Sequence, residues 1–190
     1  EVEIGFSTLK SVGLVVEAYT GLSVVVTTDE VLYNLELPFV IGDIQTNTTE
    51  DGMRSGMTFH IENIPEAAHS IAMATLTTRQ LVGDIQGTPF ADLGDAVLDH
   101  VTYGDDSVNE VFNSSQTAHS TVGTFFQKDQ VVVEVDVTSQ LQDDVDNRVA
   151  RGDFSQFLAR FETISDLGGD TDRAVFSRDL LELSVTYLHP

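Results

Sequence analysis

The most regular hydrophobic pattern in the chain lies between Gly56 and Leu76. Met57, Phe59 and Ile61 alternate with polar residues, and a period of two places such residues on one face of a β-strand. A proline follows, which removes a backbone donor and interrupts strand pairing, and a second alternating run comes after it. The segment therefore predicts two strands joined by a link that lies outside the ladder.

Similar alternating runs, separated by clusters of Gly, Asp, Asn and Thr, recur along the whole chain. So many short strands indicate an all-β protein: a two-sheet antiparallel β-sandwich, specifically a jelly roll. We find no repeat, linker or domain boundary, so we expect a single domain over residues 1–190. The predicted strands are Val2–Phe6, Gly13–Tyr19, Leu22–Thr27, Glu36–Ile41, Met57–Glu62, Ser70–Thr77, Ala96–Val101, Gly123–Phe126, Val131–Val137, Gln156–Glu162, Ala174–Ser177 and Leu181–Leu188.

One segment has helical rather than strand spacing. Leu141, Val145 and Val149 recur every four residues, and a Thr-Ser pair ahead of them offers a helix cap. Gly152 follows as a stop signal. We therefore expect one short helix near Gln140–Val149, crossing one end of the sandwich.

Charge excludes several classes of partner. Lys and Arg total 9 against 31 Asp and Glu, which gives a net charge of -22. Such a surface repels nucleic acid and anionic membranes and favours divalent cations or high salt. No apolar run reaches the roughly 18 residues of a membrane span. We therefore expect neither nucleic-acid binding nor membrane insertion.

The chemistry-bearing residues do not form an enzyme motif. The chain has no cysteine, which excludes disulfides and thiolate chemistry, and its five histidines show no metal-binding spacing. We interpret His60 and His100 as ordinary surface or rim residues. Two glycosylation sequons, at Asn47 and Asn113, matter only in an exported protein. The first residue is Glu1, which we interpret as a sign of processing.

Several phrases occur in the order found in a family of secreted modules. They are Val97–Asp105, Val135–Thr138 with Gln142–Val145, Gln156–Phe161, Asp172–Phe176 and Leu183–Tyr187. Together with the opening strand pair they resemble the DNRLRE-type domain, a jelly roll related to carbohydrate-binding modules. The resemblance implies an extracellular sandwich, secreted or at the cell surface.

The resemblance runs from about Glu36 to the end of the chain. The motif that gives the family its name is absent, so no ligand residue is carried over from it. Residues from Glu1 to about Asp29 have no counterpart and look like an added N-terminal segment. Fold membership alone does not establish sugar binding.

An acidic loop near the C-terminus is a candidate calcium site. Asp166, Asp170 and Asp172 supply three carboxylates, and two glycines between them permit tight turns. Calcium prefers such hard oxygen ligands in a flexible loop. The alternative interpretation is a solvated turn without an ion.

The N-terminal segment carries the functional hypothesis. Val2, Ile4 and Phe6 alternate with Glu1, Glu3 and Gly5, so the segment predicts a strand with one apolar face. Such a strand can pair within its own sheet or insert into a neighbouring molecule, where it would add a strand to the partner's sheet. We therefore expect a non-enzymatic extracellular structural protein, a filament subunit that polymerises with itself by N-terminal strand exchange.

Two alternatives remain open. One is a carbohydrate-binding module that recognises surface glycans, although the chain has no Trp and few aromatic residues for stacking on sugars. The other is a surface domain of a halophile, in which the charge serves only solvation. A filament protein forms polymers, a glycan-binding module stays monomeric, and a halophile domain depends on molar salt for stability.

Overall fold

The computed structural model describes residues 8–15, 22–26, 31–34, 39–43, 52–68, 70–80, 85–103, 119–126, 132–166 and 168–189. Strands dominate this part of the chain, which confirms the all-β prediction. The strands are β1 Thr8–Val15, β2 Leu22–Val26, β3 Val31–Asn34, β4 Phe39–Asp43, β5 Gly52–His60, β6 Ser70–Gln80, β7 Ala96–Val101, β8 Ser120–Phe126, β9 Val132–Asp136, β10 Phe154–Phe161 and β11 Arg173–His189.

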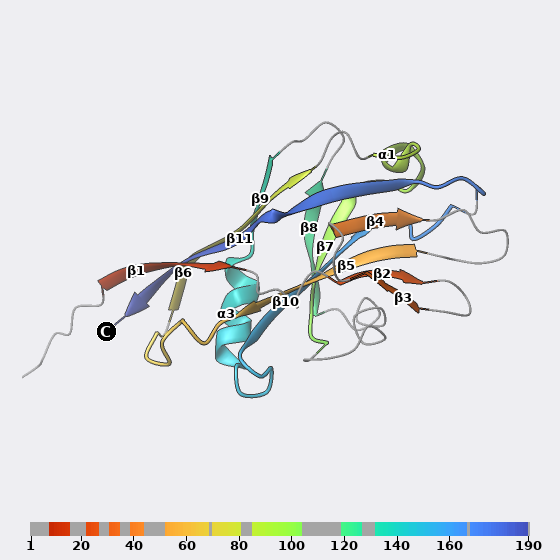
Figure 1. Ribbon diagram of the computed structural model, residues 1–190. Helices are drawn as coiled ribbons and strands as arrows, with labels where there is room; N and C mark the ends of the chain where they lie inside the picture. The colour runs from red at the N-terminus through yellow and green to blue at the C-terminus, as the bar shows by residue number, and fades with distance from the viewer. Residues whose placement is uncertain are drawn as a thin grey trace, which may run out of the picture.

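The strands form two antiparallel layers that share one long strand (Figure 1). The first layer has the order β8-β7-β10-β5-β4 and ends on the start of β11, while β2 and β3 extend from β5. The second layer consists of β9, β6, the later part of β11, and β1. Because β11 pairs with β4 through Arg173–Phe176 and with β6 mainly through Glu182–Leu188, the hydrogen-bonded ladder is continuous from one layer into the other.

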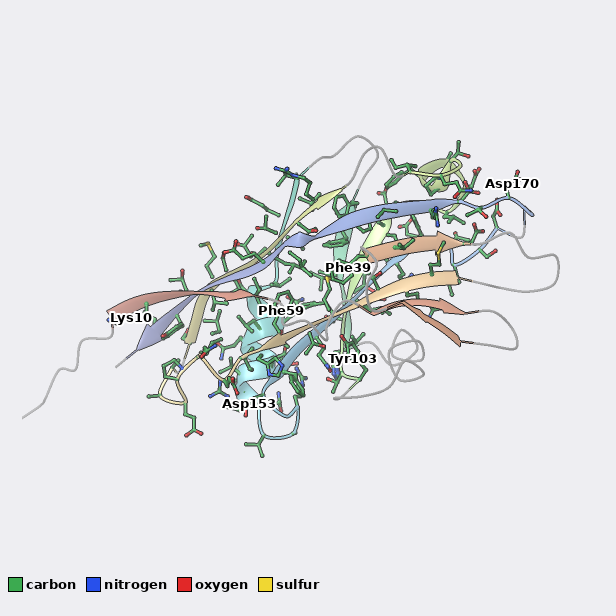
Figure 2. All side chains as sticks on the ribbon, in the orientation of Figure 1. Lys10, Phe39, Phe59, Tyr103, Asp153 and Asp170 are labelled. Atoms are coloured by element: carbon green, nitrogen blue, oxygen red, sulfur yellow. The ribbon has the colours of Figure 1, made fainter. Side chains whose placement is uncertain are left out.

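The apolar phase of each strand builds the core between the layers. In β10, Phe157, Ala159 and Phe161 are buried in the main hydrophobic cluster, and alternation turns Gln156 and Arg160 to the other face. Figure 2 shows other core side chains, including Phe39 and Phe59, in the interior. The rings of Phe126 on β8 and Phe176 on β11 stack in this core with centroids 4.2 Å apart.

The predicted helix is present with different ends. Helix α3 covers Thr138–Asp146, begins after Val137 and has no side-chain cap. The Thr138 hydroxyl instead accepts a hydrogen bond from Ala74 N, which ties the helix to β6. The expectation of a single helix was wrong, because Pro89–Asp92 forms a one-turn helix, α1, too short to show a periodic pattern.

Several strand bounds also differ from the predicted ones. β3 was not predicted, and β1 covers Thr8–Val15 where we expected a strand to start at Gly13. The last two predicted strands are one strand, β11, since an irregular register between Ser177 and Glu182 absorbs the polar interruption. No helix in the described part of the chain has the length and hydrophobicity needed to cross a membrane.

Candidate functional site

The N-terminal strand lies at the edge of the second layer. β1 pairs antiparallel with the end of β11, from Thr8 opposite His189 to Val15 opposite Glu182. β6 pairs with the other edge of this part of β11, so β1 completes the layer there. Figure 1 shows the start of β1 and the C-terminus together at one end of the molecule. The described part of β1 therefore begins at this end of the sheet, at Thr8.

The two ends of the ladder, β8 and β9, lie next to each other in sequence and in space. Residues 127–131 link them, yet β8 pairs with β7 and β9 pairs with β6. In the ranges that the structure describes, neither strand has a second partner. β8 therefore belongs to the first layer and β9 to the second, and the described ladder has a gap between these two strands.

A cavity of about 490 Å³ opens at this gap, beside the start of α3. Its volume lies within the range of sites that bind ligands. Apolar atoms come from Ile71 on β6 and Val122 on β8. The polar lining comes from Asp136, Thr138, Ser139, Gln140 and Gln142.

Hydrogen bonds fix the polar side of the cavity. Gln142 Oε1 accepts from Ile71 N at 2.7 Å, and the Asp136 carboxylate accepts from Thr138 N at 2.9 Å. The bond with the Thr138 side chain, together with this backbone bond, lowers the pKa of Asp136. The carboxylate is therefore ionised at neutral pH and faces the cavity as an acceptor.

The predicted calcium ligands are brought together only in part. Carboxylate oxygens of Asp166 and Asp172 lie within 4.8 Å of each other and of Asp92, which the sequence did not point to. Asp170 is exposed, and it does not belong to this group. Figure 2 places Asp170 and Lys10 at opposite ends of the molecule, so this loop is remote from β1.

Backbone contacts hold the acidic group in place. Asp172 is only 4% exposed, its carboxylate accepts a hydrogen bond from Thr88 N, and its own N–H donates to Asp43 Oδ1 at 2.9 Å. Gly42, with φ of +141°, lets β4 approach closely, because a Cβ atom there would collide with the carbonyl oxygen of Asp172.

Electrostatics at this group favour a cation. Burial raises the pKa of Asp172, and the neighbouring Asp43, Asp92 and Asp166 carboxylates raise it further, although the Thr88 bond opposes them. In the described ranges none of these four carboxylates forms an ion pair, whereas the buried Asp99 and Asp144 pair with arginines. Calcium binds several hard oxygen ligands at once, so a group of neighbouring carboxylates fits this ion.

A second cluster already contains its own cation. His100 Nε2 lies 2.9 Å from Asp144 Oδ1, Ser155 Oγ donates to Asp144 Oδ2 at 2.5 Å, and Arg151 pairs with Asp144 and with Asp143. His100 is 2% exposed, so its interpretation as a surface or rim histidine was wrong. Because Arg151 supplies the positive charge, the cluster needs no metal ion.

This cluster is not arranged for nucleophilic catalysis. The Ser155 hydroxyl donates to the carboxylate rather than to the imidazole, and a serine nucleophile needs the base as its partner. Ser155, His100 and Asp144 are all buried, so no substrate reaches them. The Arg151 bond lowers the pKa of Asp143, which is typical of a structural ion pair.

Tyr103 is poorly placed to stack on a sugar ring. Its hydroxyl is hydrogen-bonded to Thr58 Oγ1 at 2.8 Å, its backbone N–H donates to Gln156, and burial raises its pKa. Tyr103 thus works as a structural anchor on the outer face of the first layer.

The remaining predicted site residues lie outside the described residues: the donor residues Val2, Ile4 and Phe6 and the sequon residues Asn47 and Asn113. The DNRLRE-type resemblance stays a prediction. No protein-family model matches the chain, and no curated protein matches it.

Proposed function

We propose that the protein is a non-enzymatic structural subunit of an extracellular or cell-surface filament, assembled by exchange of N-terminal strands. The observation that carries this proposal is the position of β1. It is an edge strand that starts opposite His189, at the end of the sheet, and the proposed donor residues come directly before it in the sequence. Strand addition supplies affinity through main-chain hydrogen bonds and through alternate side chains.

The proposed donor has enough apolar surface for a persistent contact. Burying Val2, Ile4 and Phe6 contributes on the order of 1.5–3 kcal/mol per side chain. Each added ladder hydrogen bond contributes about 0.5–1.5 kcal/mol more. Part of this free energy is lost to the entropy of association. A subunit that donates at one end and accepts elsewhere grows into an open fibre rather than a closed ring.

Truncation tests the proposal. Removing Glu1–Ser7 should leave a folded monomer, measured by sedimentation and negative-stain electron microscopy. A peptide of the same seven residues should bind that monomer and block growth of the full chain. A control peptide with Val2, Ile4 and Phe6 replaced by Ser keeps the length and charge but should neither bind nor block. Fibres formed by the truncated chain would show that the donor lies elsewhere.

A carbohydrate-binding module remains the second candidate, and the lining of the cavity beside α3 favours it. Thr138, Ser139, Gln140 and Gln142 offer the hydroxyl and amide groups that bind sugar hydroxyls. This function predicts a monomer that retains neutral oligosaccharides on a glycan array. Alanine at Gln140, whose described side-chain hydrogen bond is from the neighbouring Ser139, should then weaken retention.

Calcium at Asp92, Asp166 and Asp172 would stiffen the subunit in either case. It would join α1 to the acidic loop directly before β11, which lies far from α1 in the sequence. The ion neutralises carboxylates that face no counter-charge in the described part of the chain.

A further inference from the structure

We propose that β11 is the acceptor strand for a second copy of this chain, whose β1 takes the place that β1 occupies here. The exchanged segment then extends from Glu1–Ser7 through Thr8–Val15. The inference rests on the proposed strand exchange and names the surface that receives the donor. The structure contains the closed form of this contact, in which donor and acceptor belong to one chain.

The edge of β11 that β1 covers belongs to a core strand. Leu183, Val185 and Tyr187 on this part of β11 are buried in the main hydrophobic cluster, and β6 pairs with the opposite edge. Without β1, the eight residues from Glu182 to His189 lose their ladder partners on this side. Unpaired N–H and C=O groups on a strand edge template a new strand. This edge therefore calls for a donor strand, from its own chain or from another copy.

β1 of a second copy fits this edge because its sequence is identical. The register places Val12 opposite Val185 and Leu14 opposite Leu183, so the apolar positions of the two strands share one phase. An exchanged β1 forms the same eight residue pairs as the closed form. Exchange of an identical element is a low-cost route to assembly, because each contact that is given up within a chain is regained between chains.

The connection between β1 and β2 favours exchange. β1 ends at Val15 in the second layer and β2 begins at Leu22 beside β5 in the first layer, so residues 16–21 connect the two layers. Short connections that must turn the chain back favour domain swapping. The strand pattern in the sequence also continues from Gly13 to Tyr19, past the end of β1. An exchanged chain has no need to turn at Val15, so its strand can follow this pattern.

β1 is also free to leave without disturbing other strands. It is the first described element of the chain, and β11 is its ladder partner in the described ranges. A subunit that gives its β1 to one neighbour has an empty β11 edge for another copy. Exchange therefore propagates into an open chain unless two subunits exchange with each other and close the contact.

A disulfide between β1 and β11 tests whether β1 must leave its own subunit. Ser11 lies opposite Thr186, and opposed residues of an antiparallel pair have Cα atoms about 4.5–5.5 Å apart, which suits a disulfide. The chain has no cysteine, so the double variant Ser11→Cys with Thr186→Cys adds this bond alone. We expect the oxidised monomer to form no fibres and the reduced protein to form them like the wild type.

The matched control moves one cysteine to the next strand. Thr75 is half-buried, as Thr186 is, and lies on the same face of the sheet, but β11 separates it from β1. A separation of two strand spacings, about 10 Å, is too long for a disulfide. Ser11→Cys with Thr75→Cys should therefore assemble equally well with and without oxidant.

Cross-linking between chains measures the exchange without requiring fibres. Ser11→Cys and Thr186→Cys are made as separate proteins, one of them isotopically labelled, then refolded together and oxidised. Mass spectrometry should find about tenfold more linkage of residue 11 to 186 than to a cysteine at 75, because docking raises the local concentration of the pair. Val15→Cys with Glu182→Cys is a second opposed pair at an exposed position, and it replaces the first if Thr186→Cys fails to fold.

The outcomes separate this inference from the proposed function. Fibres from the oxidised Ser11→Cys, Thr186→Cys protein, or equal linkage between chains at residues 75 and 186, would overturn the inference. Strand exchange by Glu1–Ser7 at another acceptor would still stand if truncation abolished the fibres. If the wild type forms no fibres while residues 11 and 186 link between chains, the filament proposal fails and exchange at β11 stands as a closed pair.

Discussion

His100 and Asp144 form a buried contact of 2.9 Å between Nε2 and Oδ1, and they connect the end of β7 to helix α3. The same carboxylate accepts from Ser155 on β10 and pairs with Arg151 in the turn before that strand. One side chain thus joins the helix to two strands of the first layer.

Replacing Asp144 with Asn should therefore destabilise the fold strongly. The change leaves Arg151, which is largely shielded from solvent, short of one negative partner, and removing one member of a buried ion pair costs about 3–5 kcal/mol. Urea unfolding measures the loss. Asp146→Asn is the control, because Asp146 is exposed on the same helix and bonds only to Gln142 in the described contacts. Equal effects at the two positions would show that Asp144 has no special role.

Calcium removal should lower the melting temperature. A ligand that binds only the folded state stabilises it by about 2.7 kcal/mol at 100 times its dissociation constant. Differential scanning fluorimetry with calcium and then with a chelator measures this response. Asp92→Asn should abolish it, because Asp92 belongs to the carboxylate group. Asp170→Asn should preserve it, and the reverse pattern would favour the ligand set expected from the sequence.

In calcium-free buffer, Asp172→Asn should raise stability at neutral pH. The folded-state pKa of Asp172 is raised, so the folded protein holds this proton more tightly than the unfolded chain does. The wild type consequently loses stability as pH rises through that folded pKa, while the variant does not. Unfolding measured between about pH 3 and 7 should show the two curves converging below the ordinary carboxyl pKa near 3.9. A constant difference in unfolding free energy between wild type and variant over this pH range would contradict a raised pKa for Asp172.

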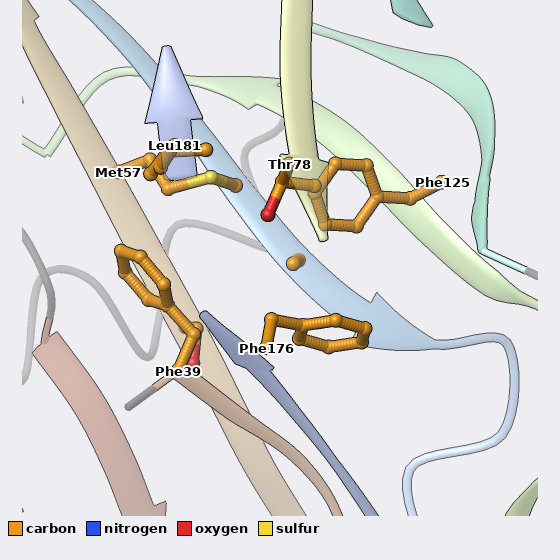
Figure 3. Close-up of a pocket in the computed structure, with 8 residues that line it drawn as sticks. Phe39, Met57, Thr78, Phe125, Phe176 and Leu181 are labelled. Atoms are coloured by element: carbon orange, nitrogen blue, oxygen red, sulfur yellow. The ribbon is translucent and has the colours of Figure 1, made fainter. Parts of the chain in front are cut away.

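Thr78→Val should stabilise the core by about 1 kcal/mol, at the low end of the cost of an unsatisfied buried group. Thr78 is 1% exposed, and its hydroxyl has no partner among the described residues. Figure 3 shows the hydroxyl directed into a small cavity beside Phe39, Phe125 and Phe176. The cavity volume, about 10 Å³, is at the lower limit for one water molecule.

The same substitution one residue earlier is the control. Thr77 lies on the opposite face of β6 and is half-buried, so Thr77→Val should change the free energy of unfolding little. A clear loss of stability in Thr78→Val would reveal a water-mediated partner of the hydroxyl.

The local sequence pattern predicted some strands closely. Ala96–Val101 matches β7 residue for residue, and Leu22–Thr27 differs from β2 by one residue. All six residues of β7 are buried, so its match comes from a short, mostly apolar run that turn residues bound on each side, and not from burial of one face. By contrast, α1 is one turn long, and its fold depends on a proline at its start rather than on a repeating pattern.

The sites were less predictable because they depend on contacts distant in sequence. Two of three expected calcium ligands meet, yet Asp92 joins them from a helix that periodicity did not reveal. His100 lies between Asp99 and Val101 in the sequence, and its burial comes from distant residues, Asp144 on α3 and Phe157 on β10. The gap between β8 and β9 follows from which strands pair, and no local pattern encodes that choice.

The pairing of β1 with β11 has a mechanical consequence. Antiparallel hydrogen bonds lie perpendicular to the strands, so tension along β1 loads the ladder in shear. The eight residue pairs from Thr8–His189 to Val15–Glu182 then resist together instead of separating one after another. β11 continues beyond them into its pairing with β4, so tension that enters at one end of the subunit is transmitted along a single strand into the other layer.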